Sequence, residues 1–98
     1  MQIVKSELLE NGMRYTAGQP EGVCSYLMEV ITEGDTIRQV RVTGGCDGNL
    51  QGISRLVVGQ KIEDVVERVE GIDCNGKGTS CPDQLSQLLQ YIVDNDLK

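Results

Sequence analysis

Residues 23–43 read VCSYLMEVITEGDTIRQVRVT, in which Gly34-Asp35 separates two runs rich in Val, Ile, Thr and Tyr. Runs of this composition favour β-strands, because branched and aromatic side chains pack well on a pleated surface. A Gly-Asp dipeptide between two such runs favours a tight turn. We therefore predict a β-hairpin with its strands over residues 23–32 and 36–43.

The register of this hairpin brings two cysteines together. If Glu33 and Thr36 flank the turn, the numbers of paired residues sum to 69, and Cys24 then lies opposite Gly45. Directly opposed residues of antiparallel strands have Cα atoms about 5 Å apart. Since Cys46 follows Gly45, we expect Cys24 and Cys46 to meet at the open end of the hairpin.

Downstream of the hairpin the apolar residues recur every three or four positions, which predicts helices. The first helix is expected to take Asp47 or Asn49 as its N-cap and to stop at Gly59, and the second to stop at Gly71. Their apolar faces consist of Leu50, Ile53 and Val57 in the first helix, Ile62, Val65, Val66 and Val69 in the second, and Leu85, Leu88, Leu89 and Ile92 in a third.

The third helix is predicted to begin at Pro82, a favourable first helical residue, which puts Cys81 at or beside its N-cap. A further hairpin is predicted near the N-terminus, because Asn11-Gly12 favours a two-residue type I′ turn. Strands that come first and helices that follow predict an α+β fold, a small antiparallel sheet with about three helices packed on it. A chain of 98 residues predicts a single domain over 1–98.

Composition excludes several classes of function. Nine basic and fifteen acidic residues give a net charge of -6, with no Lys/Arg cluster suited to nucleic acid. No apolar run approaches the roughly 20 residues of a membrane span, and residues 1–7 lack the features of a signal peptide. We predict a cytoplasmic protein, a compartment in which thiols are normally kept reduced.

Four cysteines in such a chain predict metal binding or redox chemistry before disulfides; they are Cys24, Cys46, Cys74 and Cys81. Their spacing differs from the paired CxxC pattern of zinc ribbons, so inert, buried cysteines stay an alternative. Cys74 is expected to be the least constrained, because the glycine-containing segment 75–80 follows it. The chain has no His, which excludes Cys-His and Ser-His-Asp nucleophile arrangements, and no catalytic residue is predicted.

Two motifs carry a family resemblance. Residues 79–83 read TSCPD and residues 44–54 read GGCDGNLQGIS. Together they closely resemble the small stand-alone, four-cysteine members of the TSCPD domain family, over about residues 15–89. Related domains occur at the C-terminal end of adenosylcobalamin-dependent ribonucleotide reductases. The resemblance implies a metal-binding or accessory role, with a ribonucleotide reductase large subunit as a partner, and a chain this short cannot hold ribonucleoside-diphosphate reductase activity by itself.

A more distant likeness is to U-type iron-sulfur scaffold proteins, whose three cysteines are similarly placed to Cys24, Cys46 and Cys81. It implies a similar fold and a cluster-handling protein as a partner. The chain departs from the scaffold pattern at Tyr26, where scaffolds have Asp, and at Ser80, where they have His. Cys74 is a candidate replacement for one lost ligand.

The leading hypothesis is that four thiolates hold zinc or an iron-sulfur cluster in a structural, delivery or accessory role. Two alternatives are an accessory module of ribonucleotide reductase and a thiol redox or persulfide carrier.

Overall fold

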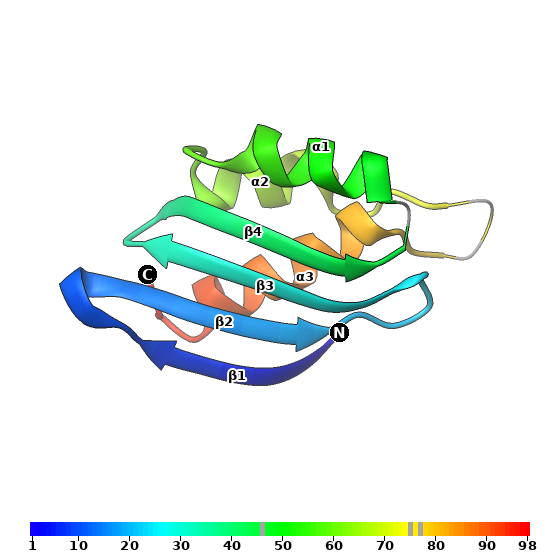
Figure 1. Cartoon of the computed structure of the whole chain (residues 1–98). Helices are drawn as coiled ribbons and strands as arrows, with labels where there is room; N and C mark the ends of the chain where they lie inside the picture. The colour runs from blue at the N-terminus through cyan, green and yellow to red at the C-terminus, as the bar shows by residue number, and fades with distance from the viewer. Residues whose placement is uncertain (46, 75, 77) are drawn as a thin grey trace.

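The computed structural model describes residues 1–45, 47–74, 76 and 78–98. Strands β1 to β4 form one antiparallel sheet in chain order, and the helices follow in the sequence (Figure 1). The predicted α+β arrangement is therefore confirmed. In chain order the elements are β1 (Gln2–Leu8), the 3-10 turn η1 (Glu10–Gly12), β2 (Met13–Gln19), β3 (Ser25–Glu33), β4 (Thr36–Gly44), α1 (Asp47–Val57), α2 (Ile62–Val69) and α3 (Cys81–Asp94).

The N-terminal hairpin joins β1 to β2 through the predicted turn. Asn11 and Gly12 have φ angles of 63° and 77°, both in the left-handed region. The N–H of Met13 donates to the carbonyl of Glu10 across the turn. Positive φ at both central residues is the mark of a type I′ turn, and Asn followed by Gly tolerates it best.

The predicted register holds at both ends of the β3–β4 hairpin, although two bulges interrupt it. The pair beside the turn and the pair Ser25–Gly44 at the open end both have numbers that sum to 69. Between them, Arg38 is an extra residue in β4 and Tyr26 is an extra residue in β3, so the two shifts cancel. Ser25, the neighbour of Cys24, thus pairs as the sequence predicts.

The bulges also decide which side chains face the core. Ile37 and Val40 are both buried although they stand an odd number of positions apart in β4. Ser25 and Met28 of β3 show the same pattern. In an unbroken strand successive residues point to opposite faces, so the extra residue between each pair returns the second side chain to the core face.

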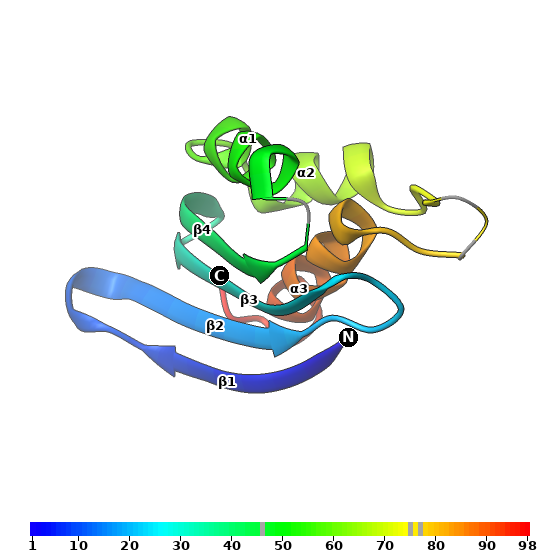
Figure 2. The ribbon, with the colours of Figure 1, turned by 45° about the vertical axis from the view of Figure 1, so that its right-hand side comes forward.

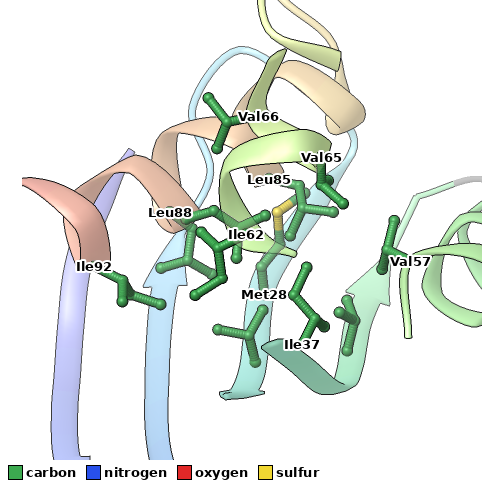
Figure 3. Close-up of a cluster of buried hydrophobic side chains, with 12 residues drawn as sticks. Met28, Ile37, Val57, Ile62, Val65, Val66, Leu85, Leu88 and Ile92 are labelled. Atoms are coloured by element: carbon green, nitrogen blue, oxygen red, sulfur yellow. The ribbon is translucent and has the colours of Figure 1, made fainter. Parts of the chain in front are cut away.

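The core lies between the sheet and the helices, and Figure 3 shows side chains such as Met28, Ile62 and Leu88 gathered there. Burial of each large aliphatic side chain contributes about 1.5–3 kcal/mol relative to its exposure to water. The core is therefore the main source of stability. Its members come from β3, β4 and all three helices: Met28, Val30, Ile37, Val40, Val57, Ile62, Val65, Val66, Leu85, Leu88, Leu89 and Ile92.

The connection between α1 and α2 is anchored on β4. The N–H of Gly59 donates to the carbonyl of Ile37 at 2.7 Å, and the N–H of Ile37 donates to the carbonyl of Gln60 at 2.9 Å. Gly59 has a φ of 87°, which ends α1 where predicted. Both helices are thereby held against the β4 side of the core, as Figure 1 shows.

Helix starts differ slightly from the sequence prediction. Helix α1 begins at Asp47, so both residues predicted as possible N-caps, Asp47 and Asn49, lie within its first turn. An acidic residue suits the first turn of a helix as well as the cap, which is why composition alone does not separate the two positions. Helix α3 begins at Cys81 with Ser80 as its N-cap, so the prediction that Cys81 lies at or beside the cap is confirmed.

The segments that carry the described cysteines lie at one end of the molecule. In Figures 1 and 2 the β2–β3 connection, the last residues of β4, the first turn of α3 and the segment before it all lie at the same end. We call residues 20–25, 44–45, 71–74, 76 and 78–83 the cysteine end. Within the described part of the chain, no helix has both the length and the apolar character of a membrane span.

Candidate functional site

Three of the four predicted ligands lie among the described residues. Cys24 is exposed in the β2–β3 connection, Cys74 is exposed before α3, and Cys81 is half-buried as the first residue of α3. Each is a free thiol. The prediction for Cys46 lies outside the described residues. The structure therefore brings the three elements to one end, and it leaves two of the thiols accessible to solvent.

Ser25 joins two of these elements directly. Its hydroxyl lies 3.4 Å from the sulfur of Cys81, and the residue is only 3% exposed. Gly45, which precedes Cys46 in the chain, packs against the same serine, since a β-carbon placed at Gly45 would lie 3.4 Å from Cβ of Ser25. The neighbours of Cys24 and Cys46 thus meet, as the hairpin register predicts. Their position beside Cys81 was not predicted by the register.

The β2–β3 connection also contacts α3 and the segment before it. The N–H of Glu21 donates to Oε1 of Gln84 at 3.0 Å. A β-carbon placed at Gly22 would lie 3.2 Å from Cγ2 of Thr79, so the backbone of Gly22 lies close to the side chain of Thr79. Gly22 has a φ of 75°, a conformation that glycine adopts without strain. These contacts fix the loop that leads into Cys24.

Cys74 lies in a hydrogen-bonded segment, residues 71–80, which we call the strap; it is described except at 75 and 77. The N–H of Cys74 donates to the carbonyl of Thr79 at 3.0 Å. The carboxylate of Asp73 accepts from the N–H of Gly76 at 2.8 Å and also from the N–H of Gly78. The sequence predicted that Cys74 is the least constrained of the four cysteines. In the structure its N–H bond ties its backbone to Thr79, and Asp73 beside it is bonded to two further residues of the strap.

A single carboxylate holds both ends of the strap. Oδ1 of Asp83 accepts from the N–H of Gly71 at 2.7 Å, and Oδ2 accepts from the hydroxyl of Thr79 at 2.5 Å. The side-chain amide of Gln87 lies 3.4 Å from Oδ2. Asp83 is 8% exposed. The hydrogen bond from Thr79, with those from Gly71 and Gln87, lowers the pKa of Asp83 below its ordinary value, although burial opposes the shift.

Comparison with known proteins supports the sequence resemblance. The TSCPD domain matches residues 8–93, nearly the whole chain. This chain belongs to the TSCPD domain family. No curated protein and no solved structure matches it. The likeness to U-type iron-sulfur scaffolds stays a prediction.

The structure gives every residue of the TSCPD motif a local role. Thr79 donates to Asp83, and Ser80 caps the helix by accepting from the N–H of Asp83 at 3.1 Å. Pro82 lies in the first turn, where its missing N–H costs no hydrogen bond. Cys81 is therefore presented on a helix start that four neighbouring residues fix.

The motif's polar residues were not predicted to contribute to the site. The spacing Ser80-x-x-Asp83 is close to a capping box, and that signal could have identified the pair in the sequence. The bond from Asp83 to Gly71 has no local signal, because the two residues lie twelve positions apart and meet only when the strap folds back.

Among the described residues, no group of three His, Cys, Asp or Glu side chains is arranged to hold a metal ion. The described cysteines are nevertheless soft sulfur donors at one end of the molecule, a donor type that suits zinc and iron-sulfur clusters. The sulfur donors therefore fit zinc or an iron-sulfur cluster. A binding site would form when the thiols of the cysteine end come together.

Proposed function

We propose that this TSCPD domain binds zinc or an iron-sulfur cluster through the thiolates of Cys24, Cys46, Cys74 and Cys81. The observation that carries the proposal is the contact between Ser25 and Cys81, because it joins the loop of Cys24 to the helix start of Cys81. Gly45 packs on the same serine and precedes Cys46. The strap adds Cys74, whose N–H donates to the carbonyl of Thr79, two residues before Cys81.

The donor set favours these two cofactors. The chain has four cysteines and no His, so the nearest soft ligands are all sulfur. Four thiolates suit tetrahedral zinc or the iron atoms of a cluster, and they suit magnesium or calcium poorly. When bound, zinc would supply cross-linking of the loops, and a cluster would add electron transfer.

A closed shell of four sulfurs leaves no open coordination position for a substrate. The role that follows is structural, delivery or accessory, and not that of an enzyme acting alone. Binding has to bring the exposed thiols of Cys24 and Cys74 toward Cys81, since the described residues form no three-ligand group.

The test is anaerobic purification followed by an absorption spectrum and elemental analysis. Iron and sulfide with visible charge-transfer bands would identify a cluster, and a colourless protein with one zinc per chain would identify a zinc site. Each single Cys→Ser variant is expected to lose most of the bound metal. Met13→Leu is the control, because it removes a sulfur at the far end of β2. Unchanged metal content in Cys24→Ser and Cys81→Ser would disprove the proposal.

A second candidate function is thiol chemistry, which the exposure of Cys24 and Cys74 favours. The thiolate of Cys81 would attack a partner's disulfide and release one partner thiolate. The thiolate of Cys74 would then attack the mixed disulfide and release the other, so two cysteines are oxidised and one disulfide is reduced. Rapid labelling of one thiol, in protein that holds no metal after anaerobic purification, would favour this function over the first.

We propose two candidate partners. A ribonucleotide reductase large subunit is suggested by the resemblance of the two sequence motifs to reductase-linked domains, and a cluster-handling protein by the likeness to iron-sulfur scaffolds. The measurement is size-exclusion chromatography of the metal-loaded domain with each candidate. A stable complex that the Cys81→Ser variant fails to form would support the assignment, and absence of a complex with either would refute it.

A further inference from the structure

The strap that carries Cys74 is closed at its base by one side chain. Gly71 and Thr79 stand eight positions apart, and both donate to the carboxylate of Asp83, at 2.7 and 2.5 Å. A carboxylate has two oxygens that only accept, so it can serve two donors at once. Closure of the strap thus depends on a single charged group.

A short chain of contacts links Asp83 to Cys74. The N–H of Cys74 donates to the carbonyl of Thr79, whose hydroxyl donates to Asp83. Gln84 supports the same threonine, because its side-chain amide donates to Oγ1 of Thr79 at 2.9 Å. Removal of the carboxylate would leave Thr79 with the bond from Gln84 and would loosen, through Thr79, the backbone of Cys74.

Asp83 also belongs to the element that presents Cys81. It lies in the first turn of α3, and its N–H donates to the capping hydroxyl of Ser80 at 3.1 Å. The residue is 8% exposed, so its bonds are shielded from competing water. The cap bond uses the backbone N–H, which any residue at this position supplies. The side chain of Asp83 therefore acts on the two ends of the strap of Cys74 and not on the helix start of Cys81.

From these contacts we propose that Asp83 is a positioning residue for Cys74: it holds the strap so that the Cys74 thiol stays on the same side as Cys81. This inference rests on the proposed metal-binding function. Residues that orient a metal ligand through hydrogen bonds typically change metal affinity about 10- to 100-fold when they are replaced. Asp83 acts on a ligand's backbone through Thr79, so we expect a loss within that range.

The experiment measures Co²⁺ affinity by visible absorption, in the full chain kept reduced and anaerobic. Asp83→Asn keeps the size of the side chain but replaces one acceptor oxygen with a donor NH₂ group, which cannot accept from Gly71 or Thr79. We expect about 10- to 100-fold weaker binding than in the wild type. Asp94→Asn on the exposed end of the same helix is the matched control, and its affinity should equal that of the wild type.

The decisive comparison uses the Cys74→Ser background, titrated with enough excess Co²⁺ to measure its weaker binding. If Asp83 acts through Cys74, then Asp83→Asn should cause no further loss of affinity once Cys74 is absent. A merely structural role would weaken binding by the same factor in both backgrounds, and that result would overturn the inference. An unchanged affinity in the Asp83→Asn single variant would overturn it as well.

Thr79→Val provides a second, milder variant in case Asp83→Asn fails to fold. It removes one hydroxyl donor and leaves the carboxylate and its bond to Gly71 in place. A smaller loss of affinity that again disappears in the Cys74→Ser background is expected, and a loss that persists there would contradict the role.

A separate measurement distinguishes this inference from the proposed function. If the wild type binds no Co²⁺, the proposed metal-binding function is wrong. The role of Asp83 is then tested by the rate at which iodoacetamide alkylates Cys74, in a chain whose other three cysteines are replaced by Ser. Faster alkylation in Asp83→Asn than in Asp94→Asn would support positioning of Cys74. Equal rates would overturn it.

Discussion

The core and the cysteine end of this domain are held together by different forces. The core consists of aliphatic side chains from the sheet and the helices, and several of them, such as Met28 and Leu88, are fully buried. The cysteine end is held mainly by hydrogen bonds to two carboxylates, those of Asp73 and Asp83, and by close backbone approaches at glycines such as Gly45.

Because of this difference, stability and the proposed binding function depend on separate parts of the domain. Apolar burial does not depend on a bound metal, so the core is expected to fold the domain whether or not the thiols are occupied. A typical hydrogen bond contributes only about 0.5–1.5 kcal/mol net, so the cysteine end can be rearranged at modest cost. A binding site that must close around its ligand belongs on such a segment.

The largest expected effect tests the core. Leu88→Ala removes a side chain that is 0% exposed, and it should lower the free energy of unfolding by about 2–5 kcal/mol. Urea denaturation of the metal-free protein measures it. Leu56→Ala is the control, because Leu56 is 77% exposed and its truncation should change stability by less than about 0.5 kcal/mol. Equal losses of unfolding free energy in the two variants would contradict the distinction between core and surface.

The next effect concerns the close approach at Gly45, which has a φ of 79°. A β-carbon there would lie 2.8 Å from Cδ1 of Leu50 and 3.2 Å from the N atom of Ser25, so Gly45→Ala adds crowding to backbone strain. We expect a loss of about 2–3 kcal/mol in unfolding free energy. Gly59→Ala isolates the strain alone, because its β-carbon would meet nothing within 4 Å, and it should cost about 1 kcal/mol. If Gly45→Ala is at least as stable as Gly59→Ala, then Leu50 and Ser25 move away from the added β-carbon at no cost in free energy.

Asp83 gives the cysteine end a pH dependence. Its folded-state pKa lies below the ordinary value of 3.8, so its carboxylate stabilises the fold above that pH, and the contribution disappears as pH falls through the lower folded-state pKa. Near neutral pH, Asp83→Asn should cost about 1–3 kcal/mol, because a buried donor loses its acceptor. Unfolding curves of the metal-free wild type and the variant should converge in acid. A gap that stays constant down to the lowest pH at which both fold would contradict this.

The smallest effect lies outside both regions, on the outer face of the sheet. The hydroxyl of Tyr15 donates to Glu29 at 2.5 Å, and this bond raises the pKa of the phenol above its ordinary value of 10.0. The stability that the bond contributes is present below pH 10 and is lost as pH rises through the folded-state pKa. Tyr15→Phe should cost less than about 1 kcal/mol near neutral pH, with Co²⁺ affinity unchanged. A change in metal affinity would show that the outer face is coupled to the cysteine end.

Much of the fold could be predicted because its signals are local. The hairpin turns at Asn11-Gly12 and Gly34-Asp35 and the apolar spacing of the helices depend on residues close in sequence, and the structure bears them out. The bulges at Tyr26 and Arg38 could not be predicted, because an extra strand residue is favourable only when the core decides which side chains must be buried.

The candidate site was predicted in outline and not in its supporting contacts. Register places Ser25 beside the start of the β4–α1 connection, and the motif places Cys81 at a helix start, as expected. The hydrogen bonds by which Asp83 holds Gly71 and Thr79 were not predicted. A carboxylate in the first turn of a helix is ordinarily interpreted as a partner of the helix dipole. Whether the four cysteines share a metal stays a prediction that the experiments above address.

The sequence by itself determined the order of the elements, the type I′ turn at Asn11-Gly12, the register at the open end of the second hairpin and the family of the chain, because these depend on neighbouring residues and on long motifs. Only the tertiary structure decided that Ser25 meets Cys81 and that Asp83 closes the strap from Gly71 to Thr79. These contacts join residues far apart in the chain, and they form only after apolar burial has packed α3 against the sheet.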